Sequence, residues 1–174
     1  MWDEANFSLV PILARTWAER GHVPILYESE KRTSETGVGF ITLTPKRRKA
    51  NFRFTIYPGS ADTHELVHDL HLVHRYFKKT VMIVWDALPA HKGAERHFRL
   101  HHPDWFVFHY FPTYSPELNP VEQCWNEMKN NQLSNFVADN VFELREAALA
   151  AATEINNRAE TLLPMFFKHS RLRL

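Results

Sequence analysis

The sequence predicts an α/β fold in which a mixed sheet is flanked by helices, and three observations support it. Residues 37–44 (GVGFITLT) and 51–57 (NFRFTIY) read as two strands joined by a tight turn. Two continuous apolar runs, at residues 81–85 and 105–111, suit strands buried within a sheet. Segments with helical periodicity lie between and after these runs. Strand–helix–strand units of this length imply parallel pairing with right-handed crossovers.

The first half of the chain is expected to be irregular over residues 5–36, with one short extended piece at 23–27. The turn PKRRK then joins the strands at 37–44 and 51–57 into an antiparallel hairpin. Asp62 is placed to cap a helix that runs to about residue 79. The apolar residues of this helix share one stripe and are Leu66, Leu70, Val73 and Phe77.

The second half alternates strands and helices. The expected elements are a doubly buried strand at 81–85, a helix at 92–101, a strand at 105–111, a helix at 116–133 and a helix at 141–162. Pro164 is expected to end the last helix. Chemistry in such sheets gathers at the carboxyl ends of the parallel strands.

Composition limits the class of protein. The chain has 174 residues without repeat or linker, which predicts a single domain over residues 1–174. Because Cys124 is the single cysteine, an intrachain disulfide and a cysteine zinc cluster are excluded. The formal net charge of +1 does not by itself indicate a nucleic-acid-binding protein. No apolar run approaches the ~20 residues of a membrane span. We therefore expect no membrane partner.

Three groups of acidic residues are candidates for catalysis, and each also has a structural interpretation. Asp86 follows a predicted buried strand, where it is either a turn residue or part of a site at the sheet edge. Glu122 leads a polar stripe of its helix, but Asn119 and Glu122 also have the spacing of a capping box. Asp3 and Glu4 at the start of the chain read as solvated acids on composition alone.

Histidine and tryptophan patterns favour structural roles. A polar stripe opposite the apolar stripe of the 62–79 helix is expected to be solvated rather than a zinc site, because no third ligand is apparent. Its residues are His64, His68, His71 and Arg75. Three tryptophans, Trp2, Trp85 and Trp125, are expected in the core.

Two further features have an open interpretation. The hairpin turn is either a soluble tip or a phosphate contact for DNA, through Lys46, Arg47, Arg48 and Lys49. His91 follows Asp86 by five residues and is either a histidine at the core edge or a group that supports the acid.

Convergence of Asp3, Asp86 and Glu122 would define a metal site. Like charges packed together raise one another's pKa, and a divalent cation reverses that cost. Mg²⁺ prefers oxygen ligands, and two such ions ~3.5–4 Å apart hold the attacking and leaving oxygens of a phosphoryl displacement. This chemistry requires acids but no cysteine, glycine-rich loop or organic cofactor, which suits this sequence.

Three segments carry a family resemblance. They are DEANFSLVPILARTWAERGHVPIL, VMIVWDALPAH and FPTYSPELNPVEQCWNEMKNNQLSNF. The sequence resembles the DDE transposases of bacterial insertion sequences in the mariner-like superfamily, nearly co-linearly from Asp3 to about Leu172. YSPELNPVE is the most specific block, and the spacing from Asp86 to Glu122 is close to that of the family's second and third acids.

The resemblance implies an RNase H-like fold and a DNA strand cleavage and transfer activity. Asp3, Asp86 and Glu122 would be the catalytic and metal-binding acids, with two Mg²⁺ or Mn²⁺ ions, Asp3 bridging them. His91 and Asn119 would support the site. The implied partners are DNA, as element ends and target, and a second copy or a longer transposase chain. The implied location is the bacterial cytoplasm, at the nucleoid.

Two departures from the family bear on function. The chain contains no helix-turn-helix region of the kind that reads terminal repeats, and it begins two residues before Asp3. The first, central strand is therefore expected to be largely truncated. Three functions remain open: a transposase catalytic domain, a stand-alone nuclease of the same fold, and an inactive or assembly-dependent fragment that acts only by association.

Overall fold

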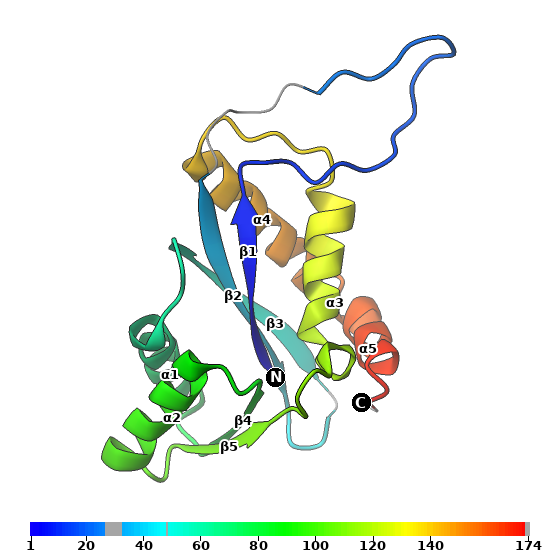
Figure 1. Cartoon of the computed structure of the whole chain (residues 1–174). Helices are drawn as coiled ribbons and strands as arrows, with labels where there is room; N and C mark the ends of the chain where they lie inside the picture. Colours follow the sequence, from blue (N-terminus) through cyan, green and yellow to red (C-terminus); the bar gives the residue numbers. More distant parts are fainter. Residues whose placement is uncertain (27–32, 48, 173–174) are drawn as a thin grey trace.

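The computed structural model describes residues 1–26, 33–47 and 49–172. The hairpin prediction is confirmed: β2 (Ser34–Leu43) and β3 (Ala50–Pro58) pair antiparallel. A further strand, β1 (Trp2–Ser8), pairs antiparallel with β2 and places Asp3 opposite Gly39. The two helices and two strands that follow occupy one side of this sheet, and three later helices occupy the other (Figure 1).

β1 corrects two predictions. The segment at residues 5–36 is not irregular at its ends, because β1 continues to Ser8 and β2 begins at Ser34. The strand that carries Asp3 is not lost either, since its seven residues all pair with β2. Residues 23–26 form no strand, and the rest of the short extended piece lies outside the described residues.

The helices and strands that follow β3 were largely predicted. Asp62 caps α1 (Thr63–Phe77) through a full capping box, and the stripe of Leu66, Leu70 and Val73 is buried. β4 (Val81–Trp85) and β5 (Phe106–Tyr110) pair in parallel around α2 (Pro89–His101).

Two expectations about this sheet are wrong. Within the described residues, β4 and β5 form a ladder of their own rather than one continuous sheet with β1–β3. β4 is not buried on both faces, because α1 and α2 cover only one of them and Met82 is 62% exposed on the other.

The helix predicted at residues 116–133 is divided into three pieces. They are a 3₁₀ turn η1 (Pro116–Leu118), the helix α3 (Val121–Asn126) and a π-helical turn η2 (Glu127–Gln132). Pro120 lacks the amide hydrogen that would continue the first turn into the second. The buried stripe of Val121, Trp125 and Met128 nevertheless runs through α3 and η2 as the pattern indicates.

The last predicted helix is also divided, into α4 (Val141–Asn157) and α5 (Ala159–His169). Pro164 does not end a helix but lies inside α5. It is on the exposed side of the helix, and Leu163 and Phe167 are buried on the other side.

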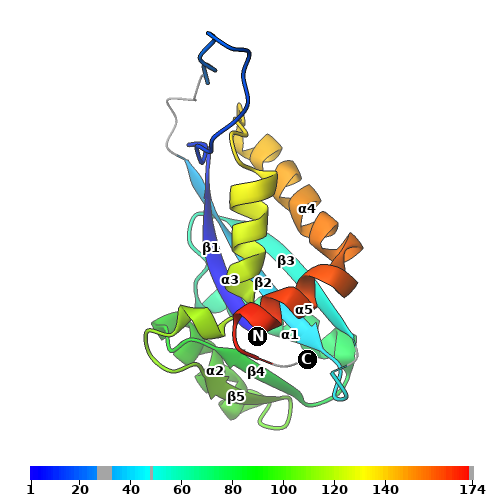
Figure 2. The same cartoon turned by 90° about the vertical axis from the view of Figure 1, so that its right-hand side faces the viewer.

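Two hydrophobic cores meet at the β1–β3 sheet. One lies under α3–α5 and contains Phe7, Phe52 and Trp125. The other lies under α1 and α2 and contains Trp2 and Trp85, so the three tryptophans are in the core as predicted. Figure 2 shows α3, α4 and α5 together on their side of the sheet.

An extended arm at residues 10–26 leaves the body of the domain after β1 (Figure 1). Its base is held by a bridge between Ile12 and Ser134 and by hydrogen bonds to Asn135. Further out, Leu13 and Trp17 are 75% and 99% exposed. Among the described helices, none is long and apolar enough to cross a membrane.

Candidate active site

The structure brings the three predicted acids into one cleft of ≈ 350 Å³. Asp3 is the second residue of β1, Asp86 directly follows β4, and Glu122 is the second residue of α3. Asn119 and the loop at residues 111–116 complete the wall. The acids come from three elements far apart in the sequence, so the cleft exists only in the folded chain.

Asp86 is held through one of its two carboxylate oxygens. Its Oδ1 accepts a hydrogen bond from the Leu88 amide at 3.1 Å, and His91 Nδ1 lies 2.6 Å from the same oxygen. His91 is buried, stacks on Trp85, and places its Nε2 3.0 Å from a carboxylate oxygen of Glu4. Burial would lower the pKa of His91, but the hydrogen bond and charge of Glu4 and the charge of Asp86 raise it.

Asp3 faces the core under α3–α5. Its Oδ2 accepts a hydrogen bond from Trp125 Nε1 at 3.0 Å. The indole of Trp125 comes so close to β2 that only glycine fits at position 39, because a Cβ there would lie 2.8 Å from Trp125 Cζ2. Gly39 therefore makes room for the side chain that orients Asp3.

Glu122 does not form the capping box that its spacing allows. The N-cap of α3 is Pro120, whose side chain makes no capping hydrogen bond. Asn119 lies just before it, where its Oδ1 accepts from the Val121 amide at 3.2 Å and its Nδ2 donates to the Trp2 carbonyl at 3.4 Å. Within the described part of the chain, no residue donates a hydrogen bond to the Glu122 carboxylate. It is left to face the cleft.

The pKa values of two of the three acids, Asp3 and Glu122, are raised. Burial, and then the charge of Glu122, raise the pKa of Asp3 to about 7, although the Trp125 hydrogen bond opposes the shift. Burial also raises the pKa of Glu122, which the charge of Lys129 partly offsets. A carboxylate pair that resists ionisation in this way is stabilised by a cation.

The donor set fits a hard divalent cation in type, since all three side chains offer carboxylate oxygens. Over residues 1–26, 33–47 and 49–172, however, no three Asp, Glu, His or Cys side chains gather closely enough to hold one ion. The acids surround the cleft instead. This spacing suits ions that keep several water ligands or share the oxygens of a bound phosphate.

The other predicted groups lie away from the cleft. Lys46, Arg47 and Lys49 are exposed at the turn between β2 and β3, and Arg48 falls outside the described residues. His64, His68 and Arg75 are exposed as expected. The prediction for His71 is wrong, because its ring packs between α1 and α2 against Phe98, Trp105 and His102.

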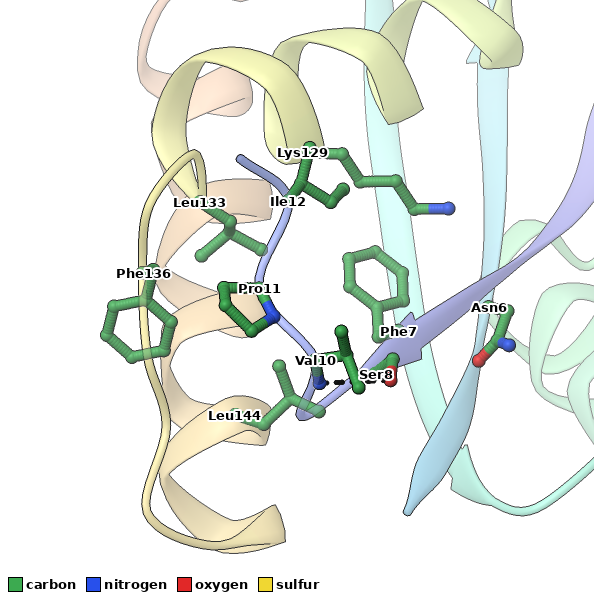
Figure 3. A pocket seen from close by; sticks show the side chains of 10 residues that line it. All are labelled: Asn6, Phe7, Ser8, Val10, Pro11, Ile12, Lys129, Leu133, Phe136 and Leu144. Atoms are coloured by element: carbon green, nitrogen blue, oxygen red, sulfur yellow. Dashed lines mark hydrogen bonds between the residues drawn. The ribbon is translucent and has the colours of Figure 1, made fainter. Parts of the chain in front are cut away.

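A second cavity of ≈ 140 Å³ lies at the base of the arm. Figure 3 shows Pro11, Leu133 and Leu144 around it, with Lys129 at one side. It is smaller than the ~300–1,000 Å³ of ordinary ligand sites. Its apolar lining indicates where the arm packs against the body.

Two residues near the cleft were not predicted in these positions. Glu4 contacts His91, a residue distant in the chain, and no local pattern connects them. Lys129 lies near both Glu122 and Asp3 and above the ring of Phe7. The only sequence signal for Lys129 was its helical spacing from Glu122, which places both residues on the polar stripe of the predicted helix.

The fold and the acidic cleft define a nuclease-type α/β domain. Residues 1–145 match the family described as DDE superfamily endonuclease. The chain therefore belongs to the DDE superfamily of endonucleases, and the resemblance carried by its three motifs is confirmed. No curated protein sequence matches the chain.

Solved structures of similar fold are complexes of Mos1 transposase. The Mos1 mariner paired-end complex with Mn has a TM-score of 0.57 at 12% identity, over 95% of this chain and 54% of that chain. A pre-cleavage Mos1 transpososome has a TM-score of 0.56 at 13% identity, with the same coverage. The RNase H-like fold is thus confirmed. The chain spans about half the length of these neighbours.

We predict that Gly39→Ala lowers the free energy of unfolding by about 1–3 kcal/mol, because the new methyl group meets the Trp125 ring. The change should cost less in a Trp125→Phe background, where Cζ2 and Cη2 of the indole are gone. Urea unfolding of the two single variants and the double variant measures this coupling. Additive effects would contradict the close approach of the two residues.

We predict that Asp3→Asn stabilises the metal-free chain at pH 7 by about 2 kcal/mol and has little effect near pH 4. The pKa of Asp3 is raised to about 7, so the unfolded chain releases its proton above pH 4 and the folded chain retains it. Folding stability is therefore lost as the pH rises through this window. Urea unfolding with EDTA at several pH values tests this. A pH-independent difference between variant and parent would contradict it.

Proposed function

We propose that this chain is the catalytic domain of a transposase that cleaves DNA strands and transfers them with the help of divalent metal ions. The observation that carries the proposal is the meeting of Asp3, Asp86 and Glu122 in one cleft. Membership of the DDE endonuclease superfamily and the Mos1 transposase fold support it.

In this proposal Asp3, Asp86 and Glu122 would hold two Mg²⁺ or Mn²⁺ ions in the cleft. When bound, such ions activate a nucleophile and stabilise the leaving oxygen of a phosphodiester. The chain's own residues supply the geometry. His91 holds Asp86, and Trp125 holds Asp3. Asn119 joins the start of α3 to β1 and so fixes Glu122 relative to Asp3.

The partners we propose are DNA, as element ends and target, and a second copy of the chain or a longer transposase. The Mos1 neighbours include a paired-end complex and a strand transfer complex. The exposed apolar residues of the arm, Leu13 and Trp17, suit association with another chain. Because both cores share the β1–β3 sheet, we propose that residues 1–174 form one domain. We also propose that it acts at the bacterial nucleoid.

Nicking of supercoiled plasmid in Mn²⁺ tests the proposal, because it requires no recognition of element ends. We expect the parent chain to nick, and Asp86→Asn or Glu122→Gln to lower the rate at least 100-fold while thermal unfolding stays cooperative. Loss of a metal-binding carboxylate removes charge from the cleft without a change in side-chain volume.

Glu117→Gln is the matched control, since Glu117 is an exposed acid of η1 that does not line the cleft. It should nick at the parent rate. Equal nicking by the parent, Asp86→Asn and Glu122→Gln would reject the site. A folded parent that does not nick would favour a fragment that acts only by association, and a strong preference for branched DNA would favour a stand-alone nuclease.

We predict that Lys46→Gln with Lys49→Gln weakens DNA binding mainly at low salt, because in this proposal the exposed basic turn between β2 and β3 contacts DNA phosphates. The slope of log K against log salt should become shallower by about 1 for each lysine–phosphate pair removed. Fluorescence anisotropy with duplex DNA at several salt concentrations measures it. Lys79→Gln with Lys92→Gln, two exposed lysines elsewhere, is the control. An unchanged slope in the turn variant would assign the turn to solubility.

A further inference from the structure

Glu4 is a second acid beside Asp3, but the alternation of β1 directs it to the opposite face of the strand. It does not line the cleft. Its Oε1 accepts a hydrogen bond from Trp2 Nε1 at 3.0 Å and lies 3.0 Å from His91 Nε2. A carboxylate with only 16% of its side chain exposed needs such partners.

His91 connects Glu4 to Asp86. The imidazole is 1% exposed and stacks on Trp85 with ring centroids 4.4 Å apart and planes inclined by 14°. Its other nitrogen, Nδ1, lies 2.6 Å from Asp86 Oδ1 and 3.0 Å from the Asp86 carbonyl oxygen. The ring is therefore held on its face and at both nitrogens. Its orientation cannot change without breaking a buried hydrogen bond.

This arrangement distinguishes the two oxygens of Asp86. Oδ1 accepts from the Leu88 amide as well as from His91. Oδ2 has no hydrogen-bond donor within the described part of the chain. Asp86 itself is about half exposed and lines the cleft, so Oδ2 is the oxygen free to meet a ligand there.

We propose that Glu4 is a positioning residue that acts through His91 to present Asp86 Oδ2 to a divalent cation. The inference rests on the proposed function, since it takes Asp86 as a metal ligand. Glu4 is not itself a ligand in this scheme, because its Oε1 already contacts Trp2 and His91 beside the core under α1 and α2. Outer partners that orient a ligand typically change metal affinity 10–100-fold.

The experiment measures the Mn²⁺ dissociation constant of the full chain by electron paramagnetic resonance, beside plasmid nicking as a function of Mn²⁺ concentration. Glu4→Leu removes the acceptor, and we expect the dissociation constant to rise about 10–100-fold, with nicking partly restored at high Mn²⁺. Glu4→Gln keeps an amide oxygen for His91 and should remain within about threefold of the parent. If Glu4→Leu does not fold, Glu4→Asp retains the charge but draws it back from His91, and should also weaken binding.

Asp69→Leu is the matched control. Asp69 is a buried carboxylate on α1 that accepts hydrogen bonds from Tyr57 and Thr55, and it does not line the cleft. It should lower the unfolding temperature without changing Mn²⁺ affinity. Equal Mn²⁺ affinity in the parent and in folded Glu4→Leu or Glu4→Asp would overturn the inference, as would an equal loss in Asp69→Leu.

The same measurements separate a failure of the Glu4 inference from a failure of the proposed function. A parent that binds Mn²⁺ and nicks, with Glu4 variants that behave like it, rejects only the role of Glu4. A parent that binds Mn²⁺ in a Glu4-dependent manner but does not nick DNA rejects only the proposed function. A parent that binds no Mn²⁺ rejects both.

Discussion

The packing of β1 on both faces is the constraint on which the site depends. Successive side chains of a strand point to opposite faces, so Trp2 and Glu4 belong to the core under α1 and α2, and Asp3 and Phe7 to the core under α3–α5. A shift of one residue in its register with β2 would exchange these sets and bury Asp3 beside the wrong helices. The position of Asp3 opposite Gly39 is therefore fixed by both cores at once.

The same constraint explains how a chain tolerates several acids at one place. Each carboxylate has its own compensation: Trp125 donates to Asp3, His91 faces Asp86, and Lys129 lies near Glu122. The compensation is incomplete for Asp3, whose pKa is raised to about 7. The cost of ionising Asp3 lowers the stability of the folded domain, and a bound cation would offset this cost in the metal site that we propose.

The sequence predicts those parts of this molecule whose causes are local. The α1 helix has its cap and its stripe within one segment, and β4 is a compact apolar run. Asp86 and Glu122 were found because distinctive motifs surround them. The residue pattern did not reveal β1, because Trp2 and Phe7 face different cores and apolar and polar residues do not alternate simply along the strand. Only the resemblance implied a strand at Asp3, and that strand was expected to be largely truncated. Glu4 and His91 are 87 positions apart in the sequence, and only the fold brings them into contact.

The errors in the helical predictions have two physical origins. In α5, the packing of apolar side chains outweighs a local helix breaker. Pro164 should end a helix by propensity, yet α5 continues through it because Leu162, Leu163, Phe166 and Phe167 are buried on the other side. In α3 and η2 the buried apolar stripe stays continuous, but the helical type changes from α to π along it. Short π-helical turns within α-helices are frequent at functional sites. Here the change separates Glu122 in α3 from Lys129 in η2, the acid that faces the cleft and the cation that moderates it.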